Sequence, residues 1–144
     1  MIITYSKPVF EPMILNGGKI HTLREDRGMR WKVGMTMHHW MGNPRNKNRK
    51  DGLIPHCFHV NEMKDKERII IARAEYDPKK LIVTVRHSRH FRVLNDQEIE
   101  MLAANDGLTI DQFRMWFVPP GSGMWKGWIL HWTDKLYSLQ ENEL

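Results

Sequence analysis

Three side chains that can do chemistry lie close together in residues 14–26, which read ILNGGKIHTLRED. They are the amine of Lys19, the hydroxyl of Thr22 and the guanidinium of Arg24, which can hold a phosphate or a carbonyl oxygen. On an extended strand Thr22 and Arg24 point to one face and Lys19 points to the other. The two glycines directly before Lys19 have the freedom to form a turn that would bring all three together. A simpler interpretation of this segment is a turn and a strand whose Lys and Arg side chains are solvated.

A polar, turn-rich stretch over residues 42–52 supplies a second group of candidates, and we predict that it forms a basic surface loop. Cationic side chains beside a flat aromatic ring suit single-stranded nucleic acid. A solvated loop beside a core tryptophan would have the same sequence pattern. Residues 86–92 form another basic run. The residues that we predict to contact nucleic acid are Gly18, Arg24, Trp40, Arg45, Lys47, Arg49 and Lys50.

The charge is distributed unevenly along the chain. The formal net charge is +5, and residues 1–50 alone carry 10 Lys/Arg against 3 Asp/Glu, whereas residues 93–144 carry 3 against 8. A basic region of this kind suits a surface that meets phosphates. We therefore expect RNA or a nucleotide as the partner.

The length of 144 residues predicts a single domain over 1–144, and 41% hydrophobic residues are enough for one core. The single cysteine, Cys57, excludes a disulfide within the chain, and the first residues, MIITYSKPVF, do not resemble a signal peptide. No apolar run approaches the roughly 20 residues of a membrane helix. We expect a cytoplasmic protein with no membrane partner, and the oligomeric state stays open.

The elements that must position the candidate residues follow from periodicity. Short β-branched or mixed segments predict strands over 35–41, 57–60, 68–75 and 81–85. Asn95 with Glu98 and Thr109 with Gln112 are capping-box pairs, so two short helices are expected in tandem, the first ending at Gly107. Alternation over 128–133 then predicts a last strand that closes a barrel.

Aromatic and histidine residues are interpreted mainly as packing. Most of four tryptophans at helical or alternating spacing are expected in the core; they are Trp116, Trp125, Trp128 and Trp132. His21 shares the face of Leu23 on a strand, which fits a hydrogen-bonded core residue, and its role stays open. The histidine spacings on strands, with one cysteine, do not predict a metal site, and no cofactor is indicated.

The segment at 17–24 resembles the signature of the ASCH family, a branch of the PUA-like β-barrels. The family pattern is Gly-x-Lys-x-x-Thr-x-Arg, and its four defined positions are matched by Gly17, Lys19, Thr22 and Arg24. Residues 32–34 resemble a second family motif, although Met35 replaces its aspartate, and residues 102–116 resemble the family's helix pair. The likeness covers about residues 9–134. It implies an α+β fold, a mixed PUA-like β-barrel with short helices packed at its side.

The resemblance also implies a function, an RNA- or nucleotide-binding domain of phage type, with a cleft between residues 17–24 and the helices over 95–117. One branch of the family deacetylates acetylcytidine, which would make Thr22 the nucleophile, Lys19 its base and Asp106 the carboxylate, one methylene shorter than the family's glutamate. Asp106 also fits an ordinary Asp-Gly helix stop. RNA cleavage and a non-catalytic role in protein interaction stay open as well.

Overall fold

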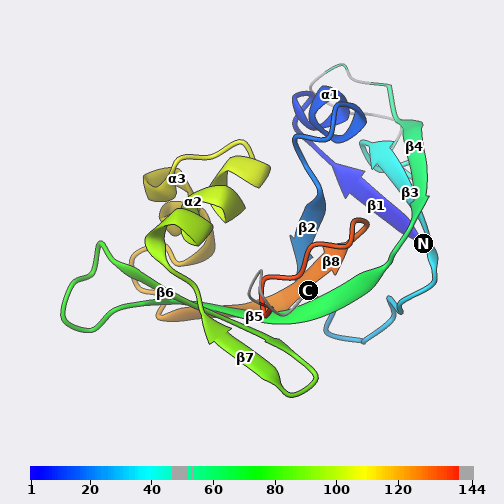
Figure 1. Ribbon diagram of the computed structural model, residues 1–144. Coiled ribbons are helices and arrows are strands. Elements are labelled where there is room, and N and C mark those ends of the chain that lie inside the picture. Colours follow the sequence, from blue (N-terminus) through cyan, green and yellow to red (C-terminus); the bar gives the residue numbers. More distant parts are fainter. Residues whose placement is uncertain (47–51, 53, 140–144) are drawn as a thin grey trace.

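The computed structural model describes residues 1–46, 52 and 54–139, and it is an α+β protein with two sheets and three helices in this part (Figure 1). The smaller sheet has the order β1-β3-β4, made by β1 (Ile2–Tyr5), β3 (Thr36–Met41) and β4 (His56–Glu62). The larger sheet has the order β2-β8-β5-β6-β7, made by β2 (His21–Arg24), β8 (Met124–His131), β5 (Asp65–Arg73), β6 (Leu81–His87) and β7 (His90–Val93). The helices are α1 (Phe10–Leu15), α2 (Asp96–Asn105) and α3 (Ile110–Phe117).

The two sheets are joined where β4 continues almost directly into β5, as the long green ribbon in Figure 1 shows. At the join the backbone N–H of Met63 donates to the carbonyl of Met35, and the N–H of Lys64 donates to the carbonyl of His131, at 2.9 and 2.8 Å. These bonds belong to the two different sheets. The chain therefore changes sheet within two residues, and the edge strands β1 and β2 come near each other.

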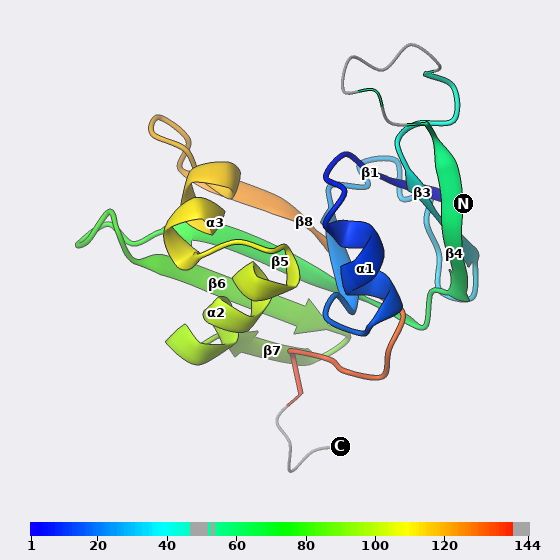
Figure 2. The same ribbon diagram turned by 90° about the horizontal axis from the view of Figure 1, so that it is seen from above.

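Two hydrophobic cores result from this arrangement. Helices α2 and α3 lie over one face of the larger sheet (Figures 1 and 2), where Ile69 and Val83 pack with Leu102 and Phe113. The second core lies at the smaller sheet, where Ile3, Met37 and Met41 are buried with Ile14 of α1 and Leu130 of β8. Leu130 and its neighbour Ile129 belong to different cores because consecutive strand residues face opposite sides.

Most predicted elements are confirmed. Both capping boxes form, so α2 and α3 begin after Asn95 and Thr109, and Gly107 follows α2 with a φ of +68°, which favours glycine. The strand around residue 128 exists, but in the described residues β8 lies inside the larger sheet between β2 and β5, and the pairing forms no closed barrel. The prediction missed β1, α1 and β7.

No helix in the described residues is long and apolar enough to cross a membrane.

Candidate functional site

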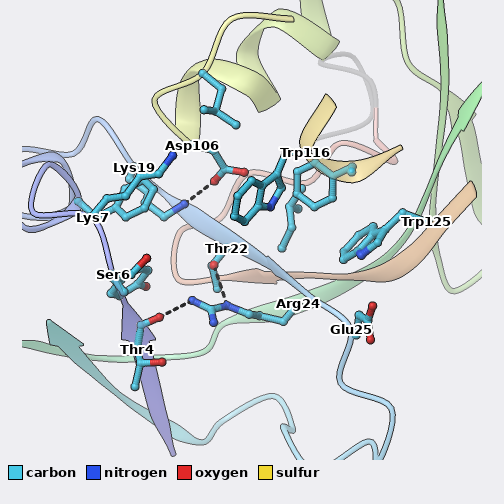
Figure 3. Close-up of a pocket in the computed structure, with 15 residues that line it drawn as sticks. Thr4, Ser6, Lys7, Lys19, Thr22, Arg24, Glu25, Asp106, Trp116 and Trp125 are labelled. Atoms are coloured by element: carbon cyan, nitrogen blue, oxygen red, sulfur yellow. Dashed lines mark hydrogen bonds and ion pairs between the residues drawn. The ribbon is translucent and has the colours of Figure 1, made fainter. Parts of the chain in front are cut away.

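A pocket of about 330 Å³ lies between the edge strands β1 and β2, the end of α2 and helix α3 (Figure 3). Its walls include all three predicted catalytic residues, Lys19, Thr22 and Asp106, together with Arg24. Asp106 lies more than 80 positions along the chain from the other three, and they meet because α2 ends beside the start of β2. The cleft expected between residues 17–24 and the helices is therefore present, and β1 forms its other wall.

Lys19 enters the pocket through the turn that the glycine pair predicted. Gly17 has a φ of +84°, and the N–H of Lys19 donates to the carbonyl of Met13 at 3.0 Å, so the turn closes before β2 begins. The side chain of Lys19 is 2% exposed, and its Nζ donates to Asp106 Oδ1 at 2.7 Å. The ring centroid of Phe10 lies 5.0 Å from the same nitrogen.

Burial and the ion pair act on Lys19 in opposite directions. Removal from water lowers the pKa of the Lys19 amine, and Arg24 lowers it further, whereas Asp106 raises it. The net effect is a pKa below the ordinary value. The amine is therefore poised to give up a proton more readily than a surface lysine, provided that Asp106 or a ligand can take part in the transfer.

Thr22 and Arg24 point to the same face of β2, as the strand alternation predicted. Arg24 Nε donates to Thr22 Oγ1 at 3.2 Å, and Arg24 Nη2 donates to the carbonyl of Thr4 at 2.9 Å. The guanidinium also lies 5.5 Å from the ring centroid of Tyr5. Burial is the main cause of a lowered pKa for Arg24. The guanidinium is thus fixed between β1 and β2 and bonded to the threonine hydroxyl.

Asp106 is the C-cap residue of α2, where the helix dipole disfavours a carboxylate, and Lys19 supplies the partner that this position needs. The preceding residue, Asn105, fixes the helix end against β2. Asn105 Oδ1 accepts the N–H of Ile20 at 2.8 Å, and its Nδ2 donates to the carbonyl of His21 at 2.9 Å. This buried amide holds α2 and β2 in the register that pairs Lys19 with Asp106.

His21, whose role the sequence left open, is a hydrogen-bonded core residue. Its side chain is fully buried, its Nε2 bonds to the hydroxyl of Tyr137 at 2.7 Å, and its Nδ1 lies 3.1 Å from Asn105 Nδ2. Burial holds the pKa of His21 well below its ordinary value, so the ring is neutral. The neutral ring therefore supports Asn105 from behind the pocket.

Aromatic rings form the rim of the pocket (Figure 3). Trp116 is 69% exposed and is the exception among the four tryptophans, most of which were predicted to lie in the core: Phe113 and Phe117 fill the buried face of the short helix α3 and leave Trp116 at the mouth. Lys7 Nζ lies 5.6 Å from its ring centroid. Trp125 is half-buried against Phe117, and the core prediction is confirmed for it and for the half-buried Trp128 and Trp132.

The remaining predicted contact residues lie elsewhere. Gly18 is in the turn, and its N–H is bonded to Asn16 Oδ1 at 2.9 Å. Trp40 is half-buried on β3 and Arg45 is exposed after that strand; neither lines the pocket. The other three, Lys47, Arg49 and Lys50, lie outside the described residues.

Sequence reasoning missed the wall contributed by the first ten residues, which includes Thr4, Tyr5, Lys7 and Phe10. The signal was the alternation in residues 2–5, where the buried Ile3 and Tyr5 alternate with Ile2 and Thr4. Four residues are a short basis for a strand, and the parallel partner β3 begins more than 30 residues later.

Comparison of the chain with models of known families, with curated proteins and with solved structures found no match. Its class is therefore defined by its own fold and site: an α+β protein with a pocket between two sheet edges that holds a buried lysine–aspartate pair, an arginine–threonine pair and an aromatic rim.

Proposed function

We propose that the chain is a PUA-like domain of the ASCH type that binds RNA or a modified nucleotide in this pocket. The observation that carries the proposal is the meeting of Lys19, Arg24 and Asp106 with an exposed indole in one cavity of about 330 Å³. A nucleobase has a flat face that stacks on aromatic rings and an edge with donors and acceptors. The cations also suit a phosphate.

Each part of the pocket then has a role. Trp116, at the mouth, has Lys7 over one side of its ring and can offer the other side to a base, while Lys7 is positioned for a phosphate. Deeper in the pocket, Asp106 Oδ2 can accept from an exocyclic amine because Lys19 occupies Oδ1. Arg24 retains N–H groups beyond the two that bond Thr22 and Thr4.

The test is binding of short single-stranded RNA and of nucleoside monophosphates at low salt. Replacing Trp116 with Ala is expected to weaken binding by about tenfold, the cost of losing one stacking contact. Met115→Ala on the same helix, at a side chain that is also exposed, is the matched control and is expected to bind like the wild type. If neither ligand binds to an excess of the wild-type protein, the proposal is wrong.

A second candidate is the amidohydrolase, which the lowered pKa of Lys19 and its contact with Asp106 favour. In this reaction Lys19 first passes a proton to Asp106, which its Nζ contacts at 2.7 Å, so that the neutral amine can accept a proton. Thr22 Oγ then attacks the acetyl carbon of acetylcytidine as its proton passes to Lys19, and Lys19 gives a proton to the leaving exocyclic amine as the C–N bond breaks. Water hydrolyses the resulting threonyl ester to acetate. Arg24 Nε, already bonded to Thr22 Oγ1, would stabilise the negative charge on that oxygen.

An assay that measures the acetate released from acetylcytidine separates the two candidates. A deacetylase is expected to lose turnover on Thr22→Ala, whereas Thr36→Ala on the exposed side of β3 keeps it. Full turnover by the Thr22 variant, or none by the wild type, contradicts the enzyme and leaves the binding proposal standing. RNA cleavage is measured in the same samples, because the family resemblance also leaves nuclease action open.

A further inference from the structure

The larger sheet has a second face, opposite to the helices. Ile69, Ile71 and Val83 point to the core beneath α2 and α3, so the residues that alternate with them point away. In Figure 1 no other element of the described chain lies against this side of β6 and β7. Phe91 and Val93, on β7, are 62% and 57% exposed there.

The strand register places one row of side chains straight across this face. Phe91 on β7 pairs with Arg86 on β6, Arg86 with Arg68 on β5, Arg68 with Trp128 on β8, and Trp128 with Arg24 on β2. Directly paired residues share a face, and five strands span about 19 Å. The row therefore runs from an exposed phenylalanine to the arginine of the pocket.

The strand residues of this face carry positive charge in two neighbouring rows. The row beside the first contains Val93, Thr84, Ile70 and Lys126, so neither row contains a carboxylate. Arg68, Arg86 and Lys126 are exposed, and none of them forms an ion pair with a carboxylate of the described residues. Cations without a carboxylate partner beside an exposed aromatic ring are the combination that binds the backbone and bases of a single strand.

A hollow lies beside this face and shares two lining residues with the pocket. It has a volume of about 420 Å³, is lined by Arg68, Lys126 and Trp128 among others, and shares Glu25 and Trp125 with the pocket. Two carboxylates also line it, and both are neutralised: Glu25 by Arg27 at 2.8 Å and Asp26 by Lys66 at 2.6 Å.

We propose that single-stranded nucleic acid lies across this open sheet face and enters the pocket at the Arg24 end. Its phosphates contact Arg68, Arg86 and Lys126, and a base stacks on Phe91, since Lys66 and Arg68 already cover Trp128 at 4.5 and 5.1 Å from its ring centroid. A second copy of the chain fits less well, because two such faces would bring like charges together. The inference rests on the proposed function for the pocket end of the strand.

The test compares a labelled single-stranded RNA of about twelve nucleotides with nucleoside monophosphates, by fluorescence anisotropy and competition. The double variant Arg68→Ala/Arg86→Ala is expected to weaken binding of the RNA at least about tenfold. It is also expected to lower the salt slope, the steepness with which the logarithm of the affinity falls with the logarithm of the salt concentration, by about 1.4, the value for two phosphate contacts on a single strand. Monophosphate binding is expected to stay unchanged. Phe91→Ala is expected to weaken only the longer ligand.

The matched control is Lys79→Ala/Lys80→Ala, which removes the same charge from the exposed turn between β5 and β6 and is expected to keep the wild-type affinity. If the Arg68→Ala/Arg86→Ala variant has the same RNA affinity and the same salt slope as the wild type, the inference is wrong. A change of oligomeric state on Phe91→Ala, seen by sedimentation, overturns it in favour of a contact between copies. Failure of monophosphates to bind the wild type counts instead against the proposed function.

Discussion

The pair formed by Lys19 and Asp106 is the chemical centre of the pocket, and its energetics are those of a nearly buried ion pair. Lys19 is 2% exposed and Asp106 is 15% exposed. Charges removed from water lose hydration that their attraction must offset, so each partner depends on the other. The pair thus ties the stability of the fold to the state of the site.

Asp106→Asn is expected to lower the free energy of unfolding by about 3 kcal/mol, because it leaves a buried ammonium without its counter-charge. Urea denaturation at neutral pH measures the loss. Asp111→Asn is the control: its carboxylate is 83% exposed and bonds Arg114, so the expected loss is below about 1 kcal/mol. The double variant Lys19→Met/Asp106→Asn should recover part of the loss, and simple additivity of the two single losses would contradict this coupling.

His39 makes the stability depend on pH. Burial is the main reason that its pKa falls from 6.5 to about 4. The neutral ring fits its partners, because Nδ1 can accept from the Tyr5 hydroxyl at 2.8 Å while Nε2 donates to Asn61 Oδ1 at 2.9 Å.

The unfolded chain protonates this histidine below about pH 6.5, whereas the folded chain does so only near pH 4, so the unfolded state binds more protons between them. The contribution of His39 to stability is expected to be constant above about pH 6.5 and to fall by about 3 kcal/mol as the pH approaches 4, and the buried His21 adds a loss of the same sign. Urea denaturation across this range measures the slope. His39→Gln, which cannot titrate, should have a shallower slope, and an unchanged slope would assign the effect to other groups.

At the scale of elements, the pocket depends on how β8 presents Trp125. Gly127 lies two residues further along the strand, on the same face, and the Trp125 ring occupies the space that a Cβ at residue 127 would need. The carbonyl oxygen of Arg24 on the neighbouring strand would lie only 2.8 Å from that Cβ. The glycine therefore allows the indole to lie against the strand and line both the pocket and the neighbouring hollow.

Gly127→Ala is expected to destabilise the protein by about 1–3 kcal/mol, since the ring and the β2–β8 pairing must both shift. It should also weaken ligand binding, because the displaced indole changes the pocket wall. Thermal denaturation and a binding titration measure the two effects. Gly123→Ala, where a Cβ meets nothing within 4 Å, is expected to change neither; equal behaviour of the two variants would show that the close contact has no cost.

At the scale of the whole molecule, a buried carboxylate attaches the segment after β8 to the larger sheet. Glu67 on β5 is fully buried and accepts from His131 Nε2 and from the N–H groups of Tyr137 and Ser138, at 2.7–2.8 Å. Burial raises the pKa of Glu67, but these hydrogen bonds outweigh it and hold the pKa below the ordinary value. Tyr137 in turn bonds His21, so the segment supports the pocket from behind.

Glu67→Gln is expected to lower the free energy of unfolding by about 2–4 kcal/mol, because the amide group turns a donor toward N–H groups that need an acceptor. Chemical denaturation measures the change, and hydrogen exchange at residues 137 and 138 should become faster. Glu100→Gln on the exposed side of α2 is the control. Unchanged exchange at these two amides would show that Glu67 does not hold the segment.

The sequence by itself determined the features that depend on near neighbours. Gly17 and Gly18 predicted the turn before Lys19, alternation predicted that Thr22 and Arg24 share a face, and the capping boxes located both helices. Each of these follows from local backbone geometry and hydrogen bonding within a few residues.

Only the tertiary structure decided what depends on residues far apart in the chain. It paired Asp106 with Lys19, placed β8 inside an open sheet, and brought β1 to the pocket through its parallel pairing with β3. It also left Trp116 at the mouth, where its helical spacing had suggested core. Strand order and helix docking are set by the combined burial of both cores, which no single segment encodes.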